Sequence, residues 1–366
     1  MKILIMGFTK IKYMPYLNFY LDNINTSYNE VHLIYWNRDL RQENTSNLKN
    51  VLLHEFRLYQ EDDVPKLSKL RSFYKYREFV FRILKQEEVD FIFVLHSLTG
   101  LLVIDKLQDR YYQKYIFDYR DSTYEKNALF KKAVGKLVHG SYATFVSSDA
   151  FRCFLPADEN KKIFTSHNLL VNDLSHQNER EKYGIRSDKI RMAFWGFIRN
   201  EKINLELIKK VSRDNRFELH YYGREQKVAL NLKQYVTQYS IQNVFFHGEY
   251  QPDDRYLFAR KTDLIHNVYD DANMMLAMGN KYYDGIIFGV PQIGMKGSFM
   301  AELLKKNQIG IAINPYDDDC FNNIFDYYMT LDLSAFKRNC SVELNRVLNQ
   351  YNTGIEFVKN TVERKG

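Results

Sequence analysis

The sequence has little cysteine and no long apolar run, and both shortages limit what the protein can be. Three cysteines in 366 residues (Cys153, Cys320 and Cys340) are too far apart to suggest a disulfide framework. No apolar run approaches the roughly 20 residues that a membrane-spanning helix needs. The N-terminal MKILIMGF also lacks the length and the cleavage site of a signal peptide. We therefore expect a protein of the reducing cytosol.

The sequence also lacks two glycine-rich phosphate-binding motifs, and it has no close Cys/His cluster. Without G-x-x-x-x-G-K-[ST] a P-loop NTPase is not expected, and the lack of G-x-G-x-x-G disfavours a nicotinamide dinucleotide fold. The missing Cys/His cluster makes a structural zinc site improbable. A net charge of +7 is modest and diffuse, so it does not indicate a nucleic-acid partner.

Short apolar runs alternate with helical segments along the whole chain. This alternation predicts an α/β protein with mostly parallel sheets and helices on both faces. We expect two Rossmann-like, doubly wound domains facing a central cleft, at 1–170 and 186–345, with a C-terminal helix, 346–366, completing the first. The polar segment 171–188 would connect them. The expected strands are 2–8, 31–36, 51–56, 90–95, 114–119, 143–148, 190–197, 217–223, 244–250, 263–269, 291–295 and 310–314, and the expected helices of the first half are 66–86, 99–108, 124–138 and 148–154.

Ligands of such sheets bind beyond the carboxyl ends of the strands, where several chemistry-bearing residues fall. In the second domain, Gly196 follows a strand, and Arg199 and Lys202 lie in or beside the next helix's first turn. Two cations beside free helix N–H groups form a good diphosphate site. The alternative is that both are solvated surface cations. Gly223 ends the next strand.

In the first domain, His96 stands directly after one strand and before a helix. It could hydrogen-bond a sugar hydroxyl or a phosphate, although a single histidine is more often structural. Asp118, Arg120 and Asp121 follow at the next strand end. They form either an internal ion-pair cluster or a polar acceptor site.

The segment NKYYDGIIFGVPQIG, 280–294, combines helical periodicity with a Gly-x-Pro stop and a short apolar strand. Gly289 is placed to end the helix in the left-handed conformation, and Pro291 prevents the helix from continuing. This pattern by itself requires only packing.

Together these features resemble the GT-B glycosyltransferases, particularly the retaining E-x7-E type common in bacterial capsule and exopolysaccharide synthesis. In "YDGIIFGVPQI" the resemblance places Asp284 at the second acidic position, which binds the donor ribose. "GFIR…K" resembles the turn that holds the donor diphosphate, and His96 matches a histidine near the donor sugar. The first acidic position is Leu276 here, and the polar substitutes nearby are Asp271, Asn273, Asn280 and Lys281.

The resemblance implies transfer of a sugar from a nucleotide-sugar donor, such as a UDP-sugar, to a lipid-linked glycan acceptor. His96 and Asp121 are the candidate catalytic residues, and Asp118 and Arg120 are candidates for acceptor binding. No His, Asp or Glu occurs in 7–21 to serve as a general base, which favours a retaining reaction. No metal or other cofactor is implied. A catalytically inactive subunit that binds a partner enzyme or glycan, and an epimerase-like GT-B enzyme, are the alternatives.

The stretch 66–85 has seven basic residues, one acidic residue and five aromatics. Leu67, Leu70, Phe73, Val80 and Leu84 follow helical spacing, so the stretch predicts a basic amphipathic helix. Such a helix can lie on an anionic membrane surface. It would place the protein on the inner face of the cell membrane. The alternative is an ordinary domain helix with a solvated face.

Overall fold

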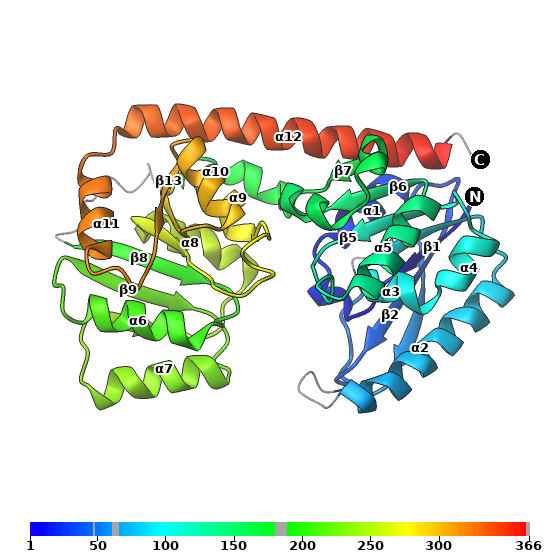
Figure 1. The fold of residues 1–366 in the computed structure, drawn as a ribbon, viewed down its shortest axis with the longest axis horizontal. Coiled ribbons are helices and arrows are strands. Elements are labelled where there is room, and N and C mark those ends of the chain that lie inside the picture. Colours follow the sequence, from blue (N-terminus) through cyan, green and yellow to red (C-terminus); the bar gives the residue numbers. More distant parts are fainter. Residues whose placement is uncertain (47, 61–65, 180–188, 364–366) are drawn as a thin grey trace. The chain divides into compact units, whose positions relative to one another are not determined.

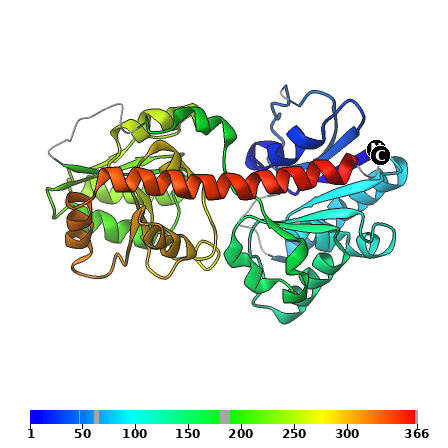
Figure 2. The ribbon, with the colours of Figure 1, turned by 90° about the horizontal axis from the view of Figure 1, so that it is seen from above.

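The computed structural model describes residues 1–46, 48–60, 66–179 and 189–363, which form two compact units. Unit 1 comprises Met1–His167 and Asn349–Gly366, and unit 2 comprises Asn168–Leu348. The long helix α12 (Leu333–Glu363) is uninterrupted and contributes its first part to unit 2 and its last part to unit 1 (Figure 2). Each unit has its own sheet and its own apolar core (Figure 1).

Unit 1 is built on a seven-stranded sheet of order β3-β2-β1-β4-β5-β6-β7, and every strand pairing in it is parallel. Residues on both sides of the central strands are buried, because helices cover both faces. The strands are β1 (Lys2–Met6), β2 (Glu30–Asn37), β3 (Val51–Arg57), β4 (Phe91–Leu95), β5 (Tyr115–Tyr119), β6 (Ala143–Val146) and β7 (Ile163–Thr165). The helices are α1 (Leu17–Ile24), α2 (Lys66–Gln86), α3 (Ser97–Leu102), α4 (Ile104–Asp109) and α5 (Ala128–Gly140).

Unit 2 repeats this plan with a six-stranded parallel sheet of order β10-β9-β8-β11-β12-β13. Helices α6 and α7 lie on one side of the sheet, and α9 and α10 on the other (Figure 1). The strands are β8 (Ile190–Trp195), β9 (Phe217–Tyr222), β10 (Val244–Phe246), β11 (Leu264–Asn267), β12 (Gln292–Met295) and β13 (Gly310–Ile313). The helices are α6 (Glu201–Val211), α7 (Lys227–Gln238), α8 (Arg255–Lys261), α9 (Asn280–Phe288), α10 (Phe299–Lys306) and α11 (Cys320–Met329).

The predicted fold class, α/β with two doubly wound parallel sheets, is confirmed. Among the elements of unit 1 that were not predicted are α1 and β7. Helix α1 begins within the segment 7–21 and ends at Ile24, and β7 has three residues, too few for a periodic signal. The segment 171–188 starts with a 3-10 helix, Val171–His176, which packs against α9; residues 180–188 lie outside the described residues.

Helix α2 covers the predicted basic stretch, and its buried side differs from the predicted one. Val80 and Leu84 are buried as expected, and Tyr76 and Ile83 join them, but Leu70 is 59% exposed. The side chain of Leu67 lies outside the described residues. No helix in the described ranges combines the length and apolar character required to cross a bilayer.

Candidate functional site

The strand orders put a topological switch point at the carboxyl edge of each sheet. In unit 2 the chain runs outward in opposite directions from β8 and β11, which lie side by side. In unit 1 the corresponding strands are β1 and β4. In such sheets these are the positions where loops separate and leave room for a ligand.

Two of the predicted donor-binding residues, Gly196 and Gly223, form the backbone floor of the unit 2 site. Gly196 follows β8 with φ +124°, a conformation that favours glycine. Gly223 follows β9, and a Cβ there would stand 2.1 Å from the Gly196 carbonyl oxygen. The two strand-end loops therefore touch backbone to backbone. Gly223 has no room for a side chain without displacement, whereas Gly196 has the room but a backbone conformation that favours glycine.

Lys281, in the first turn of α9, points its ammonium group at this floor. A Cβ on Gly196 would lie 3.9 Å from the Lys281 Nζ. The Nζ donates a hydrogen bond to the Tyr269 hydroxyl and stands 4.2 Å from the centre of the Phe194 ring. Burial lowers the pKa of Lys281 to about 7, and the Arg199 charge lowers it too, although Asp284 opposes the shift. A cation with a depressed pKa gains stability when an anion binds beside it.

The other predicted cations, Arg199 and Lys202, are exposed at the start of α6. The Arg199 guanidinium lies 5.2 Å from the centre of the Phe197 ring. Between them Asn200 has φ +59° and donates from Nδ2 to Asp270 Oδ1 at 2.9 Å, which ties the start of α6 to the loop after β11. Asn280, the first residue of α9, is half-buried.

A buried polar network that the sequence analysis missed fixes this loop. Asn204 Nδ2 donates to the carbonyl oxygens of Arg199 (2.6 Å) and Asn200 (3.1 Å). Asn204 Oδ1 accepts from the Tyr221 hydroxyl at 2.9 Å and from His266 Nε2 at 3.1 Å. Because His266 Nδ1 accepts from the Val268 N–H, Nε2 carries the proton, and burial lowers the pKa of this neutral histidine to about 3. The network fixes the backbone that carries Arg199.

Asp284, the predicted ribose ligand, is 2% exposed and both its oxygens have internal partners. Trp195 Nε1 donates to Oδ2 at 2.7 Å, and Arg255 Nη1 donates to Oδ1 at 2.8 Å. Arg255 also binds Asp173, from Nη1 at 3.0 Å and Nη2 at 2.9 Å. Burial raises the pKa of Asp284 to about 6, against the opposing effect of Arg255. In this structure Asp284 connects α9 to β8 and α8.

The rest of the segment 280–294 also packs closely, as its pattern indicated. Gly289 ends α9 with φ +72°, so the predicted left-handed cap is present. A Cβ on Gly285 would stand 2.1 Å from Gln292 Nε2. Gln292 in turn accepts from Asn267 Nδ2 at 2.7 Å and donates to the Tyr282 carbonyl at 3.0 Å. The helix therefore has buried contacts on all sides.

In unit 1, His96 lies at the switch point in a strained backbone conformation. Its φ and ψ are 81° and 145°, a backbone conformation that residues other than glycine rarely adopt. The ring lies nearly parallel to that of Phe8, which follows β1, with centroids 6.4 Å apart. His96 Nδ1 accepts from the Leu98 N–H at 3.2 Å and caps α3. Burial lowers the pKa of His96, and the nearby Asp121 charge opposes the shift.

Asp118 and Arg120, the predicted acceptor residues, form a buried internal ion pair. They are 0% and 4% exposed, and Arg120 Nε stands 2.7 Å from Asp118 Oδ1. Asp118 also accepts from the Tyr20 hydroxyl, and Arg120 donates to the Ser166 carbonyl at 3.1 Å. The pair ties the end of β5 to α1 and to the segment after β7. Asp121, one residue further on, is exposed.

Comparisons with known proteins add information on the fold. No protein-family model and no curated protein matches the chain. Among solved structures, a sucrose-phosphate synthase from Thermosynechococcus elongatus superposes with TM-score 0.72 at 11% identity, covering 100% of this chain and 98% of that one. A Rickettsia africae glycosyltransferase gives TM-score 0.67 at 14% identity, covering 99% of each chain. Anabaena HepE, in complex with UDP and glucose, gives TM-score 0.65 at 13% identity, covering 100% and 98%.

A putative UDP-N-acetylglucosamine 2-epimerase from Listeria monocytogenes is also similar, with TM-score 0.58 at 11% identity, covering 93% of this chain and 90% of that one. Identities this low carry information on the fold alone. The likeness extends over nearly the full length of this chain and of each neighbour. The two parallel α/β sheets, with their switch points, therefore give this protein the fold of the GT-B glycosyltransferases.

Proposed function

We propose that the protein is a nucleotide-sugar-dependent glycosyltransferase that binds its donor at the carboxyl edge of the unit 2 sheet. The observation that carries the proposal is Lys281, a half-buried cation with a depressed pKa, aimed at a floor made of two glycine backbones. A diphosphate there would accept hydrogen bonds from Lys281 and Arg199. These cations would stabilise the negative charge of the leaving nucleoside diphosphate. In this proposal the two side chains take the role that a metal ion would otherwise have.

The other donor-site residues have supporting parts in this proposal. Gly196 and Gly223 let the donor approach the backbone, Lys202 adds charge at the start of α6, and Asn280 offers an amide at the start of α9. Asp284 acts as a positioning residue, because it holds α9, and therefore Lys281, in place. The neighbour HepE was solved with UDP and with UDP-glucose, so a UDP-sugar is the first donor to test.

We further propose that unit 1 binds the acceptor and that the reaction retains the anomeric configuration. His96 and Asp121 would face the reacting sugar, and the strained backbone of His96 supports a functional role. Asp118 and Arg120 would support the acceptor site as a buried ion pair. The acceptor we propose is a lipid-linked glycan of capsule or exopolysaccharide synthesis, reached at the inner face of the membrane.

The outer side of α2 supports this membrane contact. Arg71, Tyr74, Lys75, Arg82 and Lys85 are all exposed on the helix, with Glu78 the one acidic residue among them. Beside it is a hollow of about 310 Å³ lined by apolar and aromatic residues, three basic residues and one acidic residue: Phe81, Leu84, Lys85, Lys106, Asp109, Arg110 and Tyr111. Anionic headgroups are attracted to such a surface.

The proposed donor site is tested by calorimetry with UDP and uridine. We expect Arg199→Ala and Lys202→Ala to weaken UDP binding and to leave the weaker uridine binding unchanged. Hydrogen bonds to charged groups contribute roughly 1.5–3 kcal/mol each, so Arg199→Ala should reduce UDP affinity by at least tenfold. Lys227→Ala on α7 is a matched control, since Lys227 is also an exposed lysine of unit 2. Unchanged UDP affinity in both site variants would refute the assignment.

A second candidate, an epimerase of nucleotide sugars, is favoured by the two epimerase structures among the neighbours. The same diphosphate site would serve it. Incubation with UDP-N-acetylglucosamine distinguishes the two by NMR, because an epimerase inverts a sugar carbon without needing an acceptor. An inactive subunit would bind UDP and turn over no donor.

A further inference from the structure

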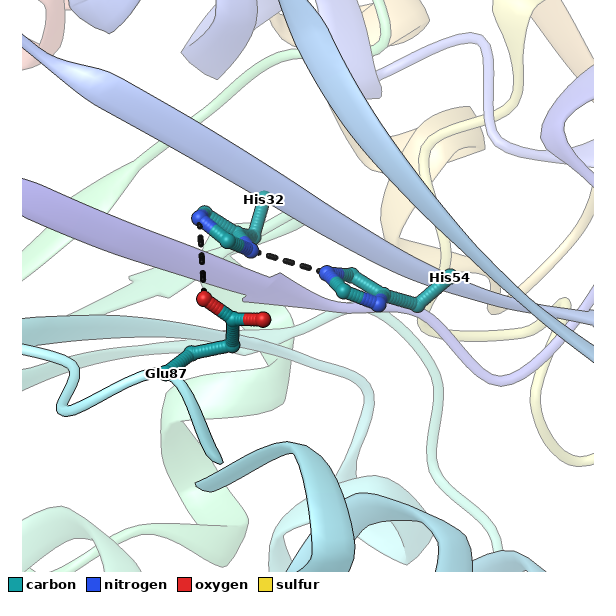
Figure 3. A group of neighbouring side chains, drawn as sticks. All are labelled: His32, His54 and Glu87. Carbon is teal, nitrogen blue, oxygen red and sulfur yellow. Dashed lines mark hydrogen bonds and ion pairs between the residues drawn. The ribbon is translucent and has the colours of Figure 1, made fainter. Parts of the chain in front are cut away.

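Three side chains at the amino end of the unit 1 sheet, remote in sequence, lie close together (Figure 3). His32 contacts His54 through Nδ1, and its Nε2 stands 3.9 Å from Glu87 Oε2. His32 is on β2, His54 is on the edge strand β3, and Glu87 directly follows α2. One ring nitrogen of each histidine and one oxygen of Glu87 lie within 4.8 Å of one another. His32 is 1% exposed, while His54 and Glu87 are half-buried. The proposed donor site lies at the opposite, carboxyl, edge of a different sheet.

The hydrogen bonds fix the proton positions on His32. Its Nε2 stands 2.8 Å from Glu30 Oε1, and a carboxylate only accepts, so Nε2 carries a proton. In neutral His32 the Nδ1 lone pair then points at His54 Nε2, 2.8 Å away. At this distance the His54 Nε2–H donates to His32 Nδ1, and a metal ion would take the place of that proton.

The surroundings match those of a metal-bound histidine. A histidine that binds a metal usually donates its other ring N–H to a carboxylate, which orients the ring. Glu30 already holds His32 in this way. Lys2 steadies both carboxylates, at 3.1 Å from Glu30 and 3.3 Å from Glu87. Two carboxylates and one ammonium leave a net charge of −1 beside two neutral imidazoles, which favours a cation.

We propose that His32, His54 and Glu87 bind a zinc ion, with solvent as the fourth ligand. Two imidazoles and a carboxylate are a common zinc donor set. Zn–N bonds of about 2.0 Å in a tetrahedral site require the two nitrogens to stand roughly 3.3 Å apart, so the rings need to separate by about 0.5 Å. The ion would link β2, the edge strand β3 and the end of α2.

Unit 2 contains a matched control for this site. His220 on β9 follows Glu218 by two residues, as His32 follows Glu30, and its Nδ1 stands 3.0 Å from His247 Nε2 beyond the neighbouring β10. His220 Nε2 stands 3.4 Å from Glu218. In the ranges that the structure describes, the metal-ligand geometry that joins Glu87 to the first pair is not found for His220 and His247. The comparison isolates the contribution of the third ligand.

The test uses the tag-free, EDTA-treated full chain, titrated with ZnCl₂ by calorimetry and followed by thermal unfolding. We expect one zinc ion to bind and to raise the Tm. His54→Gln should abolish both effects, Glu87→Gln should weaken affinity at least tenfold, and His247→Gln should change neither. Cobalt in place of zinc should give the visible absorption of a tetrahedral site.

Absence of stoichiometric binding would overturn the proposal, as would binding that persists in both His54→Gln and Glu87→Gln. Circular dichroism of the same samples checks that each variant is folded. The proposed UDP site is in unit 2 and the proposed zinc site is in unit 1. Absence of UDP binding and absence of zinc binding are therefore separate results.

Discussion

At the scale of single residues, Lys281 links the geometry of the unit 2 site to a pH dependence. Its pKa is about 7 in the free protein, and a bound diphosphate would raise it. Binding should therefore take up a proton, and UDP affinity should fall as the pH rises from about 7 to 9, by up to about tenfold per pH unit. Calorimetry in buffers of different ionisation enthalpy measures the proton directly.

Lys281→Met should remove this pH dependence, whereas Arg199→Ala should weaken binding and keep it. Wild-type affinity that stays constant over the same pH range would show that Lys281 does not meet the diphosphate.

Asp284 and Arg255 give a second residue-scale prediction, on stability. Arg255→Gln leaves Asp173 and Asp284 buried together without their cation, which should destabilise unit 2 by about 3–5 kcal/mol. Asp284→Asn leaves the Asp173–Arg255 pair intact and leaves one hydrogen-bond donor without an acceptor, which should cost about 1–3 kcal/mol. Urea unfolding followed by circular dichroism measures both. Equal losses in the two variants would contradict the account.

The stability lost in Asp284→Asn should depend on pH, and the sign follows from the pKa of Asp284. The folded pKa of Asp284, about 6, lies above its ordinary value of 3.8, so its contribution to stability is full below 3.8 and is lost as the pH rises through 6. Asp284→Asn should therefore cost less at about pH 7.5 than at about pH 4.5.

Some of these residues were identifiable from the sequence, and others were not. Gly196 and Arg199 follow a strand, so strand-end reasoning found them, whereas Lys281 came from the family resemblance as a polar substitute for the missing acidic residue. Tyr269 and Asn204 have no local signature. Their importance comes from contacts with residues far along the chain, and a single sequence does not encode such contacts visibly. The internal partners of Asp284 were missed for the same reason.

At the scale of elements, apolar periodicity predicted that α9 is a helix, but it did not predict that the helix is buried on all sides. That burial depends on contacts with other elements, such as the contact between Gly285 and Gln292. Gly285 is required by the side chain of Gln292, which crosses it. Gly285→Ala should cost about 1–3 kcal/mol through overpacking. In a Gln292→Ala background the same change should cost much less, so a double-mutant cycle should show coupling between the two. Additive losses would mean that the close approach does not constrain α9.

Gly289→Ala tests the cap of the same helix. With φ +72°, the alanine variant should lose about 1 kcal/mol, and Gly289→Asn should lose less because asparagine tolerates the left-handed region better. Thermal unfolding of the pair checks the order.

Helix α2 gives the membrane prediction. Sedimentation with vesicles containing anionic lipid should show binding that falls as salt increases and that is lost in Lys75→Glu/Arg82→Glu/Lys85→Glu. The matched control reverses three exposed unit 2 lysines, Lys227, Lys305 and Lys306, and should bind normally. Equal loss in both variants would mean that only net charge matters, and absence of binding would make α2 an ordinary solvated helix.

At the scale of the whole molecule, alternation of strands and helices was enough to predict two parallel sheets, because most strands and helices carry their own local pattern. The partnerships among them were not predictable. The Glu-x-His arrangement recurs on β2 and β9 and pairs with a histidine on the next strand, β3, in one sheet and directly after the next strand, β10, in the other. This recurrence is invisible until strand order is known, since the paired histidines are 22 and 27 residues apart.

The central claim, that the carboxyl edge of the unit 2 sheet holds the diphosphate of a nucleotide sugar, is tested most directly by donor turnover. UDP release from a panel of UDP-sugars is measured for wild type and for Arg199→Ala/Lys281→Met, with His247→Gln as a control. We expect release from at least one donor, reduced about 100-fold or more in the double variant, because it loses two charged contacts worth roughly 1.5–3 kcal/mol each. The control should behave as wild type. No release from any donor would contradict the transferase activity, and release that is equally fast in the double variant would contradict the central claim itself.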